Sequence, residues 1–481
     1  MINSYQDTIV APATTPGTGA ISIIRISGPD AFRIADAVVQ LNSGTISEAD
    51  GYTIHFGKVY SVIPSEASVS HLLDEVLVSV FRAPHSYTGE DSVEISTHAS
   101  SYIVSELIGL LLKVGARFAE PGEFTRRAFL NGKLDLAQAE AVADVISSTT
   151  AASHRVAMNQ LKGSFSADLS HLRSQLLEMA SLLELELDFS EEDVEFADRE
   201  KLLTLIQDTK EHVDKLAASF RQGNMIKNGV PVAIVGPANA GKSTLLNSLL
   251  GEERAIVTDI PGTTRDTIEE TLDVNGILFR FIDTAGIRES SDTVEKIGIE
   301  RTFQKISEAE VVICLLDASS EKSDLLNNLK VLFDRVDLTS QKLFIVLNKV
   351  DLKAQKDINK NVSLINNFVL NNKYQAEILQ IAAKAGKGVE ELKEALFAAE
   401  RDLIPDVDST FVTNVRHFEA LQNASSALSD CHTSLSSGIP SDLVAEDLRR
   451  AVAAINAILG TDLLDTEVIL HNIFRNHCIG K

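Results

Sequence analysis

One stretch constrains the fold of this chain more than any other: residues 230–251, VPVAIVGPANAGKSTLLNSLLG. Its apolar start predicts a buried strand and its end predicts a helix. Between them, Gly236 to Ser243 match the phosphate-binding pattern G-x-x-x-x-G-K-S. The glycines let backbone N–H groups turn onto phosphate oxygens, while Lys242 adds an ammonium and Ser243 a hydroxyl for Mg²⁺. The stretch therefore predicts an α/β domain that binds a nucleotide.

A second motif predicts which base is bound. The apolar strand LFIVLNKVD ends in Asn348, Lys349 and Asp351. A carboxylate at Asp351 can accept hydrogen bonds from both N1–H and the 2-amino group of guanine, whereas adenine would leave a buried carboxylate unpaired at a cost of about 1–3 kcal/mol. The segment IAAK, with Ala382, Ala383 and Lys384, is expected to close the base pocket. These residues favour GTP over ATP.

Two further motifs lie between these in the chain. LFRFIDTAG places Asp283 to hold Mg²⁺ through water and Gly286 to sense the γ-phosphate, and TDIPGTTRD offers Thr264 as a second Mg²⁺ ligand. The motifs in this order predict a GTPase. The predicted GTP-binding residues are Asn239, Ala240, Gly241, Lys242, Ser243, Thr244, Thr258, Thr264, Asp283, Thr284, Ala285, Gly286, Asn348, Lys349, Asp351, Ala382, Ala383 and Lys384.

The water-orienting glutamine of Ras-like enzymes is missing, because Ile287 follows Gly286. Asn239 in the phosphate loop could hold a monovalent cation against the phosphates, together with backbone oxygens of the TDIPGTTRD loop. Such a cation would replace an arginine finger electrostatically.

Composition limits the remaining possibilities. The chain has 481 residues, enough for about two to four domains. Its net charge of −24 argues against binding nucleic acid through a basic surface, so any such ligand would be held by a basic partner. Three cysteines without repeated spacing exclude a disulfide framework. Because no signal peptide or membrane-spanning run is found, a cytoplasmic location is expected.

The distribution of strand-like and helix-like segments along the chain predicts a multidomain protein. Residues 1–133 mix short strands and helices as in an α+β domain, residues 134–228 and 401–481 are helical, and residues 229–400 form the α/β domain. We expect this G domain to be inserted into one all-α domain. Two apolar stripes predict packed helix faces. They are Leu169, Leu172, Leu176, Ala180 and Leu183, then Leu443, Leu448, Val452, Ile455 and Leu459.

These motifs, with PGEFTRRAFLNGKLDLAQAEAVADVI and the final CIGK, resemble the MnmE (or TrmE) family, GTPases that modify the wobble uridine of tRNA. The resemblance spans essentially the whole chain. It implies Mg²⁺ on Ser243 and Thr264, and a catalytic Glu295 that organises the attacking water. It also implies K⁺ on Asn239, Thr258, Ile260 and Thr263. Family members are homodimers through their N-terminal domains, and their G domains meet when GTP and K⁺ are bound.

The resemblance also implies a one-carbon cofactor, 5-formyl- or 5,10-methylene-tetrahydrofolate, bound by Arg25, Glu94 and Lys133. The residues alone do not show this, since a lone Arg or Glu is usually a surface residue. The family acts with the flavoprotein MnmG, which uses FAD and NADH. Together they add an aminomethyl or carboxymethylaminomethyl group to C5 of uridine 34 in certain tRNAs.

The tail CIGK contains Cys478 and Lys481. A prenylation signal is disfavoured because the last residue is Lys. The resemblance implies that Lys481 binds the folate and that Cys478 lies beside the one-carbon unit, where the thiol could be a nucleophile, an acid–base group or a structural contact. Cys314 is expected in the core and Cys431 on a bundle helix.

Two residues depart from the family pattern, Ala238 in the phosphate loop and His477 before the tail cysteine. Neither residue is a predicted ligand, so these departures put the fine tuning of the sites in question rather than the activity itself. One alternative function from another class stays open. It is a GTP-switched RNA or ribosome assembly factor that performs no one-carbon chemistry.

Overall fold

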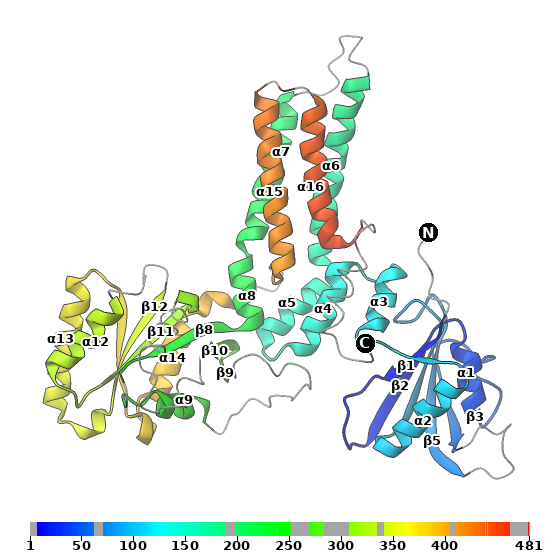
Figure 1. Cartoon of the computed structure of the whole chain (residues 1–481), viewed down its shortest axis with the longest axis horizontal. Helices are drawn as coiled ribbons and strands as arrows, with labels where there is room; N and C mark the ends of the chain where they lie inside the picture. The colour runs from blue at the N-terminus through cyan, green and yellow to red at the C-terminus, as the bar shows by residue number, and fades with distance from the viewer. Residues whose placement is uncertain are drawn as a thin grey trace. The chain divides into compact units, whose positions relative to one another are not determined.

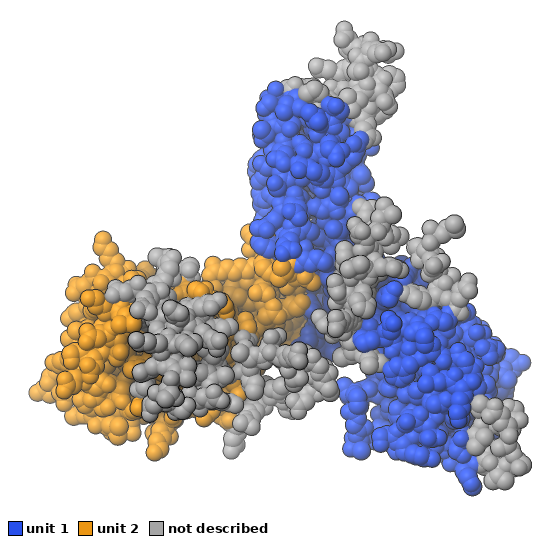
Figure 2. Space-filling view, viewed as in Figure 1, with its two compact units in different colours: residues 1–147, 157–215, 416–481 blue, residues 148–156, 216–415 orange. Residues whose placement is uncertain are grey.

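The computed structural model describes residues 7–61, 71–188, 199–237, 239–251, 270–282, 307–333, 341–404, 410–437, 439, 441–461 and 480. The chain forms two compact units: unit 1 contains residues 1–147, 157–215 and 416–481, and unit 2 contains residues 148–156 and 216–415 (Figure 2). The predicted boundaries after residues 133, 228 and 400 divide the chain into smaller parts than these two units, and they stay predictions. An α+β part, a helical part and a GTPase-type α/β part are all present, so the predicted fold class is confirmed.

Unit 1 begins with a seven-stranded sheet in the order β3-β4-β5-β6-β2-β1-β7. Its strands pair antiparallel except β1 and β7, which are parallel. The bounds are β1 Ile9–Pro12, β2 Ile21–Ser27, β3 Val39–Leu41, β4 Thr53–Tyr60, β5 Leu72–Phe81, β6 Ser92–His98 and β7 Arg117–Phe118.

Helices α1 (Ala31–Val38) and α2 (Ser101–Lys113) pack on one face of this sheet (Figure 1). Alternate strand residues such as Ile24, Val78 and Ile95 are fully buried beneath them. Because side chains alternate along a strand, the residues between them lie on the opposite face. That face carries the candidate ligands Arg25 and Glu94, which are directly opposite each other on β2 and β6.

The rest of unit 1 is helical: α3 Glu123–Leu130, α4 Leu136–Ser147, α5 Ala151–Leu161 (which begins in unit 2), α6 Ser164–Asp188, α7 Arg199–Ala218, α15 Val415–Ser436 and α16 Ser441–Leu459. Helices α6, α7, α15 and α16 run side by side as a bundle (Figure 1). Two of its cross-links are Arg173 to Asn456 and Ser425 to Asp214.

The predicted stripe on α6 is buried throughout, from Leu169 to Leu183, which confirms it. The stripe on α16 was wrong at one position, because Leu443 is 56% exposed and Val444 is buried instead. Val444 lies four residues before Leu448, which is the helical spacing, whereas Leu443 lies five before it. Cys431 is buried on α15, as expected.

Unit 2 contains a six-stranded sheet in the order β13-β12-β11-β8-β10-β9. All its pairings are parallel except the β9–β10 hairpin. The bounds are β8 Val230–Val235, β9 Glu270–Val274, β10 Ile277–Phe281, β11 Val311–Asp317, β12 Lys342–Asn348 and β13 Ala376–Gln380.

Helices cover both faces of this sheet. One apolar cluster joins it to α9 (Lys242–Leu250) and α14 (Val389–Ala399), and another joins it to α12 (Lys322–Phe333) and α13 (Gln355–Asn371). Cys314 lies in the second cluster, as expected. The remaining elements are α8 Phe220–Asn228 and the 3-10 helices η2 Val350–Leu352, η3 Ala383–Ala385 and η4 Arg401–Leu403. No helix within the described ranges is long and apolar enough to cross a membrane.

Candidate functional sites

The phosphate loop connects β8 to α9 at the carboxyl end of the parallel strands, and its two glycines are required by their surroundings. A Cβ on Gly236 would lie 2.2 Å from the carbonyl oxygen of Leu315. Gly241 has φ +98°, and a Cβ there would lie 2.4 Å from Nδ2 of Asn348. Any side chain at either position would displace the loop from its neighbouring strands.

Asn348 joins three of the predicted motifs. Its side chain is buried at the end of β12, where Nδ2 donates a hydrogen bond to the carbonyl of Ala240 (2.8 Å). Its Oδ1 accepts a hydrogen bond from the amide of Ala383 (3.0 Å). The phosphate loop, the NKVD segment and the IAAK segment therefore meet at one buried amide.

Lys349 makes a second connection to the phosphate loop. Its Nζ donates to the carbonyl of Asn239 (2.7 Å) and forms an ion pair with Asp317 at the end of β11 (2.6 Å). Burial alone would raise the pKa of Asp317, but hydrogen bonds from Lys349 and Ser319 outweigh it and lower the pKa. Our sequence reasoning missed Asp317. The available signal was an acidic residue directly after a buried strand.

The base-recognition residues differ from the expectation in one respect. Asp351 was expected to be buried, but it lies in η2, beyond the strand end, and is exposed. Burial of an unpaired carboxylate therefore gives no reason for Asp351 to prefer guanine. Ala382 and Ala383 are buried nearby, while Lys384 is exposed.

Lys242 opens α9 and is partly buried. Its Nζ donates to the carbonyls of Gly236 (2.8 Å) and Pro237 (3.0 Å), and burial lowers its pKa. Ser243 follows in the first turn, partly buried, with Thr244 exposed beside it. An ammonium and a hydroxyl at a helix N-terminus fit a phosphate with its Mg²⁺.

Many predicted residues fall outside the described ranges, and the predictions for them are untested. They are Ala238, Thr258, Ile260, Thr263, Thr264, Asp283, Thr284, Ala285, Gly286, Ile287, Glu295, His477, Cys478 and Lys481.

A second candidate site lies on the N-terminal sheet. Arg25 forms an ion pair with Glu94 across β2 and β6, with Nε and one terminal nitrogen 2.9 and 2.8 Å from the same carboxylate oxygen. The guanidinium carbon of Arg25 also lies 5.3 Å from the ring centre of Tyr87 and 5.6 Å from that of Phe124. Aromatic faces at these distances attract the cation and hold it in place.

The end of the chain returns to this pair. Arg25 donates a hydrogen bond of 3.4 Å to the carbonyl of Gly480. A Cβ on Gly480 would lie 2.0 Å from the carbonyl oxygen of Pro12, so this position accepts only glycine. Lys133 donates to the carbonyl of Pro84 (3.1 Å). The structure thus brings Arg25, Glu94 and a residue of the CIGK tail together. Lys133, which follows α3, is hydrogen-bonded to the loop between β5 and β6.

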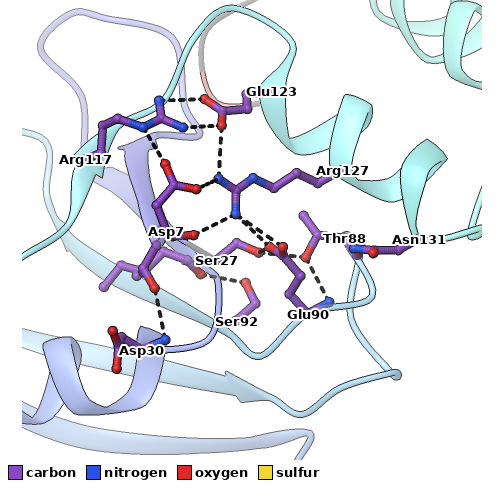
Figure 3. A network of polar contacts seen from close by, with 12 residues as sticks. Asp7, Ser27, Asp30, Thr88, Glu90, Ser92, Arg117, Glu123, Arg127 and Asn131 are labelled. Atoms are coloured by element: carbon purple, nitrogen blue, oxygen red, sulfur yellow. Dashed lines mark hydrogen bonds and ion pairs between the residues drawn. The ribbon is translucent and has the colours of Figure 1, made fainter. Parts of the chain in front are cut away.

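A cluster of charged residues lies in the same domain (Figure 3). Arg127 is fully buried and contacts Asp7, Glu90 and Glu123, while Arg117 pairs with Asp7 and Glu123. We call these five residues the Arg127 cluster. Burial by itself raises the pKa of Glu123, but hydrogen bonds from Arg117, the Glu120 amide and Arg127 outweigh it and lower the pKa. Sequence reasoning missed this cluster, since Asp7 and Glu90 are far in the chain from Arg117, Glu123 and Arg127.

Comparisons with known proteins identify the family of this chain. Residues 8–133 match the family model described as the GTP-binding protein TrmE N-terminus, and residues 136–478 match the MnmE helical domain. A tRNA modification GTPase MnmE of Bacteroides thetaiotaomicron is 48% identical over 478 residues, covering 99% of this chain and 100% of the relative. The protein of the same name from Cytophaga hutchinsonii is 47% identical over 483 residues, covering 100% and 99%. The chain therefore belongs to the MnmE family of tRNA modification GTPases.

Proposed function

We propose that this chain is a K⁺-dependent GTPase that works with the flavoprotein MnmG. Together they would add an aminomethyl or carboxymethylaminomethyl group to C5 of uridine 34 in certain tRNAs, with a tetrahydrofolate supplying the one-carbon unit. The observation that carries the proposal is that one chain holds a GTP site and, at Arg25 and Glu94, a separate polar site at which Gly480 lies. A simple GTP switch has no use for the second site.

In the GTP site, we assign guanine recognition to Asn348, Lys349 and Asp351. Lys242 would neutralise phosphate charge, and Ser243 would hold Mg²⁺ together with Thr264 and, through water, Asp283. The proposed K⁺ ligands are Asn239, Thr258, Ile260 and Thr263. The hydrogen bond from Lys349 fixes the backbone of Asn239, whereas the side chain of Asn239 is exposed. This arrangement supports a role for the Asn239 side chain as a K⁺ ligand.

Hydrolysis in this scheme depends on Glu295 to orient water, because Ile287 cannot. K⁺ would supply positive charge for the developing transition state. GTP turnover should accordingly be far faster in KCl than in NaCl, and equal rates would remove K⁺ from the proposal.

In the second site, we propose that a one-carbon tetrahydrofolate binds to Arg25, Glu94, Lys133 and Lys481. A carboxylate can accept hydrogen bonds from the pterin N–H and amino donors, and the cations suit the glutamate tail of the cofactor. When bound, the folate supplies the carbon that reaches the uridine. Cys478 would lie beside it, so Cys478→Ser should abolish modification while GTP turnover persists. Loss of both would indicate a structural role for the thiol.

The N-terminal sheet also supports a homodimer. Ile54, Phe56 and Leu77 lie on the face opposite α1 and α2, and they are 68%, 41% and 50% exposed. Exposed apolar groups of this kind mark protein interfaces. We propose that a second copy covers them, that two such chains assemble with MnmG as a heterotetramer, and that the assembly acts on tRNA in the cytoplasm without a membrane.

Nucleoside analysis of tRNA tests the proposal directly. Cells lacking this protein should lose the C5 modification of uridine 34, and the wild-type gene should restore it. FAD and NADH would be needed only through the partner, so purified chain alone should turn over GTP without modifying tRNA. Unaltered uridine 34 in the deletion strain would instead support the assembly-factor alternative.

A further inference from the structure

The loop between β5 and β6, residues 82–91, is hydrogen-bonded to α3 and to the turn that follows it. Near the carboxyl end of α3, Asn131 donates to the carbonyl of Thr88 (2.7 Å) and Lys133 donates to that of Pro84 (3.1 Å). Within α3, Thr125 shares a 2.8 Å hydrogen bond with the hydroxyl of Tyr87. Two of these hydrogen bonds join neutral groups and one has the Lys133 ammonium as its donor. Together they connect the loop to α3 and the turn after it at three points.

The fourth connection is ionic and partly buried. Arg127 on α3 lies 3.2 and 3.3 Å from the two carboxylate oxygens of Glu90, which is on the loop. Glu90 also accepts a hydrogen bond of 2.8 Å from Ser27. Ser27 is two residues from Arg25 on β2, so both side chains lie on the same face of the sheet. Glu90 thus joins α3, the loop and the strand that carries the candidate ligand.

The loop in turn determines what surrounds Arg25. Tyr87 is 38% exposed, and its ring lies against the guanidinium on one side while Phe124 of α3 lies on another. Displacing the loop would remove the Tyr87 ring and widen the range of positions open to the Arg25 side chain. The guanidinium would then be held by Glu94, by the Phe124 ring and by the 3.4 Å hydrogen bond to Gly480.

Stability does not explain why these charges are buried. The Arg127 cluster contains three carboxylates and two guanidinium groups, and both Arg127 and Glu123 are almost completely inaccessible to solvent. Buried ion pairs are often no more stabilising than apolar residues of similar size, because desolvation offsets their attraction. What they do provide is a defined geometry, since each partner accepts only a narrow range of positions.

We propose that Glu90 and Arg127 are positioning residues for the Arg25 site: they hold the loop of residues 82–91 so that Tyr87 fixes Arg25 for its ligand. This inference rests on the proposed folate function of that site. It assigns a role to residues outside the proposed set of folate ligands, and it makes α3 the element that shapes the site.

The test compares two isosteric substitutions within the cluster, Glu90→Gln and Glu123→Gln. Each removes one carboxylate that contacts Arg127, but only Glu90 is on the loop and bonded to Ser27. The full-length chain would be titrated with 5-formyltetrahydrofolate, and thermal unfolding and GTP turnover would be recorded in parallel. We expect Glu90→Gln to raise the Kd about tenfold, the effect of misplacing one charge-assisted contact. Glu123→Gln should lower the unfolding temperature and leave the Kd within about twofold.

A third variant, Thr125→Val, keeps the shape of its side chain and removes the hydrogen bond to Tyr87. It should raise the Kd severalfold without altering the charged cluster, and it tests the inference even if Glu90→Gln fails to fold. Equal effects of Glu90→Gln and Glu123→Gln on the Kd, or an unchanged Kd in both Glu90→Gln and Thr125→Val, would overturn the inference. If the wild-type chain does not bind the folate at all, the proposed function of the site fails instead.

Discussion

The GTP site and the Arg25 site are held in place by different kinds of contact. In the GTP site, Gly236 lets the loop approach the backbone of Leu315, Gly241 lets it approach the side chain of Asn348, and the buried amide of Asn348 connects three loops. In the Arg25 site, ionised side chains hold the geometry, through the Arg25–Glu94 pair and the Glu90–Arg127 pair.

The difference determines what disturbs each site. A site held by close backbone packing depends on shape, so one added methyl group is enough to displace it. A site held by ion pairs tolerates small changes of volume, but it depends on charge complementarity and therefore on pH. The following experiments test this contrast, from the largest expected effect to the smallest.

Gly241→Ala should give the largest effect. The new Cβ would meet Nδ2 of Asn348, and the residue would be strained at φ +98°. Strain and the lost hydrogen bond each cost about 1–3 kcal/mol, so we expect the Kd for GTP to rise about 100-fold. Titration with a fluorescent GTP analogue measures this. The matched control is Gly251→Ala, also at positive φ (+51°) but with nothing within 4 Å of its Cβ. Equal losses in the two variants would show that strain alone explains the effect.

Reversing the Arg25–Glu94 pair tests the charge-based site. Arg25→Glu alone sets two carboxylates opposite each other on neighbouring strands, which is destabilising. The double variant Arg25→Glu with Glu94→Arg should restore the thermal stability, because the cross-strand attraction returns. Its folate affinity should stay about 30-fold below wild type, since the ligand would meet the charges in exchanged positions. Recovery of folate binding in the double variant would show that the pair is only structural.

The same contrast explains how far sequence reasoning could reach. The candidate nucleotide ligands Gly241 and Asn348 stand in short contiguous motifs, each next to an apolar strand, so the spacing of these motifs was enough to propose them. Arg25 and Glu94 are 69 residues apart, and only the register of β2 against β6 brings them together. The Arg127 cluster was missed for the same reason, because only the fold brings Asp7 and Glu90 to Arg127. Asp317 was missed although its place at the end of a buried strand was a visible signal. The prediction placed Leu443 on the buried face of α16, because moving the first position of the apolar stripe by one residue leaves its other positions unchanged.

Acid should weaken the N-terminal sheet before the sheet of unit 2. Glu123 has a pKa lowered from 4.5 in the folded chain, so its pairing stabilises the fold fully above pH 4.5. That stabilisation is lost as the pH falls through the lower, folded-state pKa. Hydrogen exchange, corrected for its intrinsic pH dependence, should report opening of β1 and α3 in this window. The Glu123→Gln variant should have a lower free energy of unfolding at neutral pH, and that free energy should change less as the pH falls. An acid response that is the same with and without Glu123 would contradict this assignment.

Asp317→Asn should have the smallest effect. Its ion pair with Lys349 is the one ionic contact that we describe in the GTP site, and close packing holds the rest of that site. Asp317 and Lys349 are partly exposed, with side chains 16% and 32% accessible, so solvent screens their attraction. Losing it should free Lys349 from its position and raise the Kd for GTP about fivefold, or about 1 kcal/mol. The control is Ser319→Ala, which removes a hydroxyl donor to the same carboxylate but leaves the ion pair. A loss as large as that of Gly241→Ala would mean that charge holds the GTP site as well, and the contrast between the two sites would not stand.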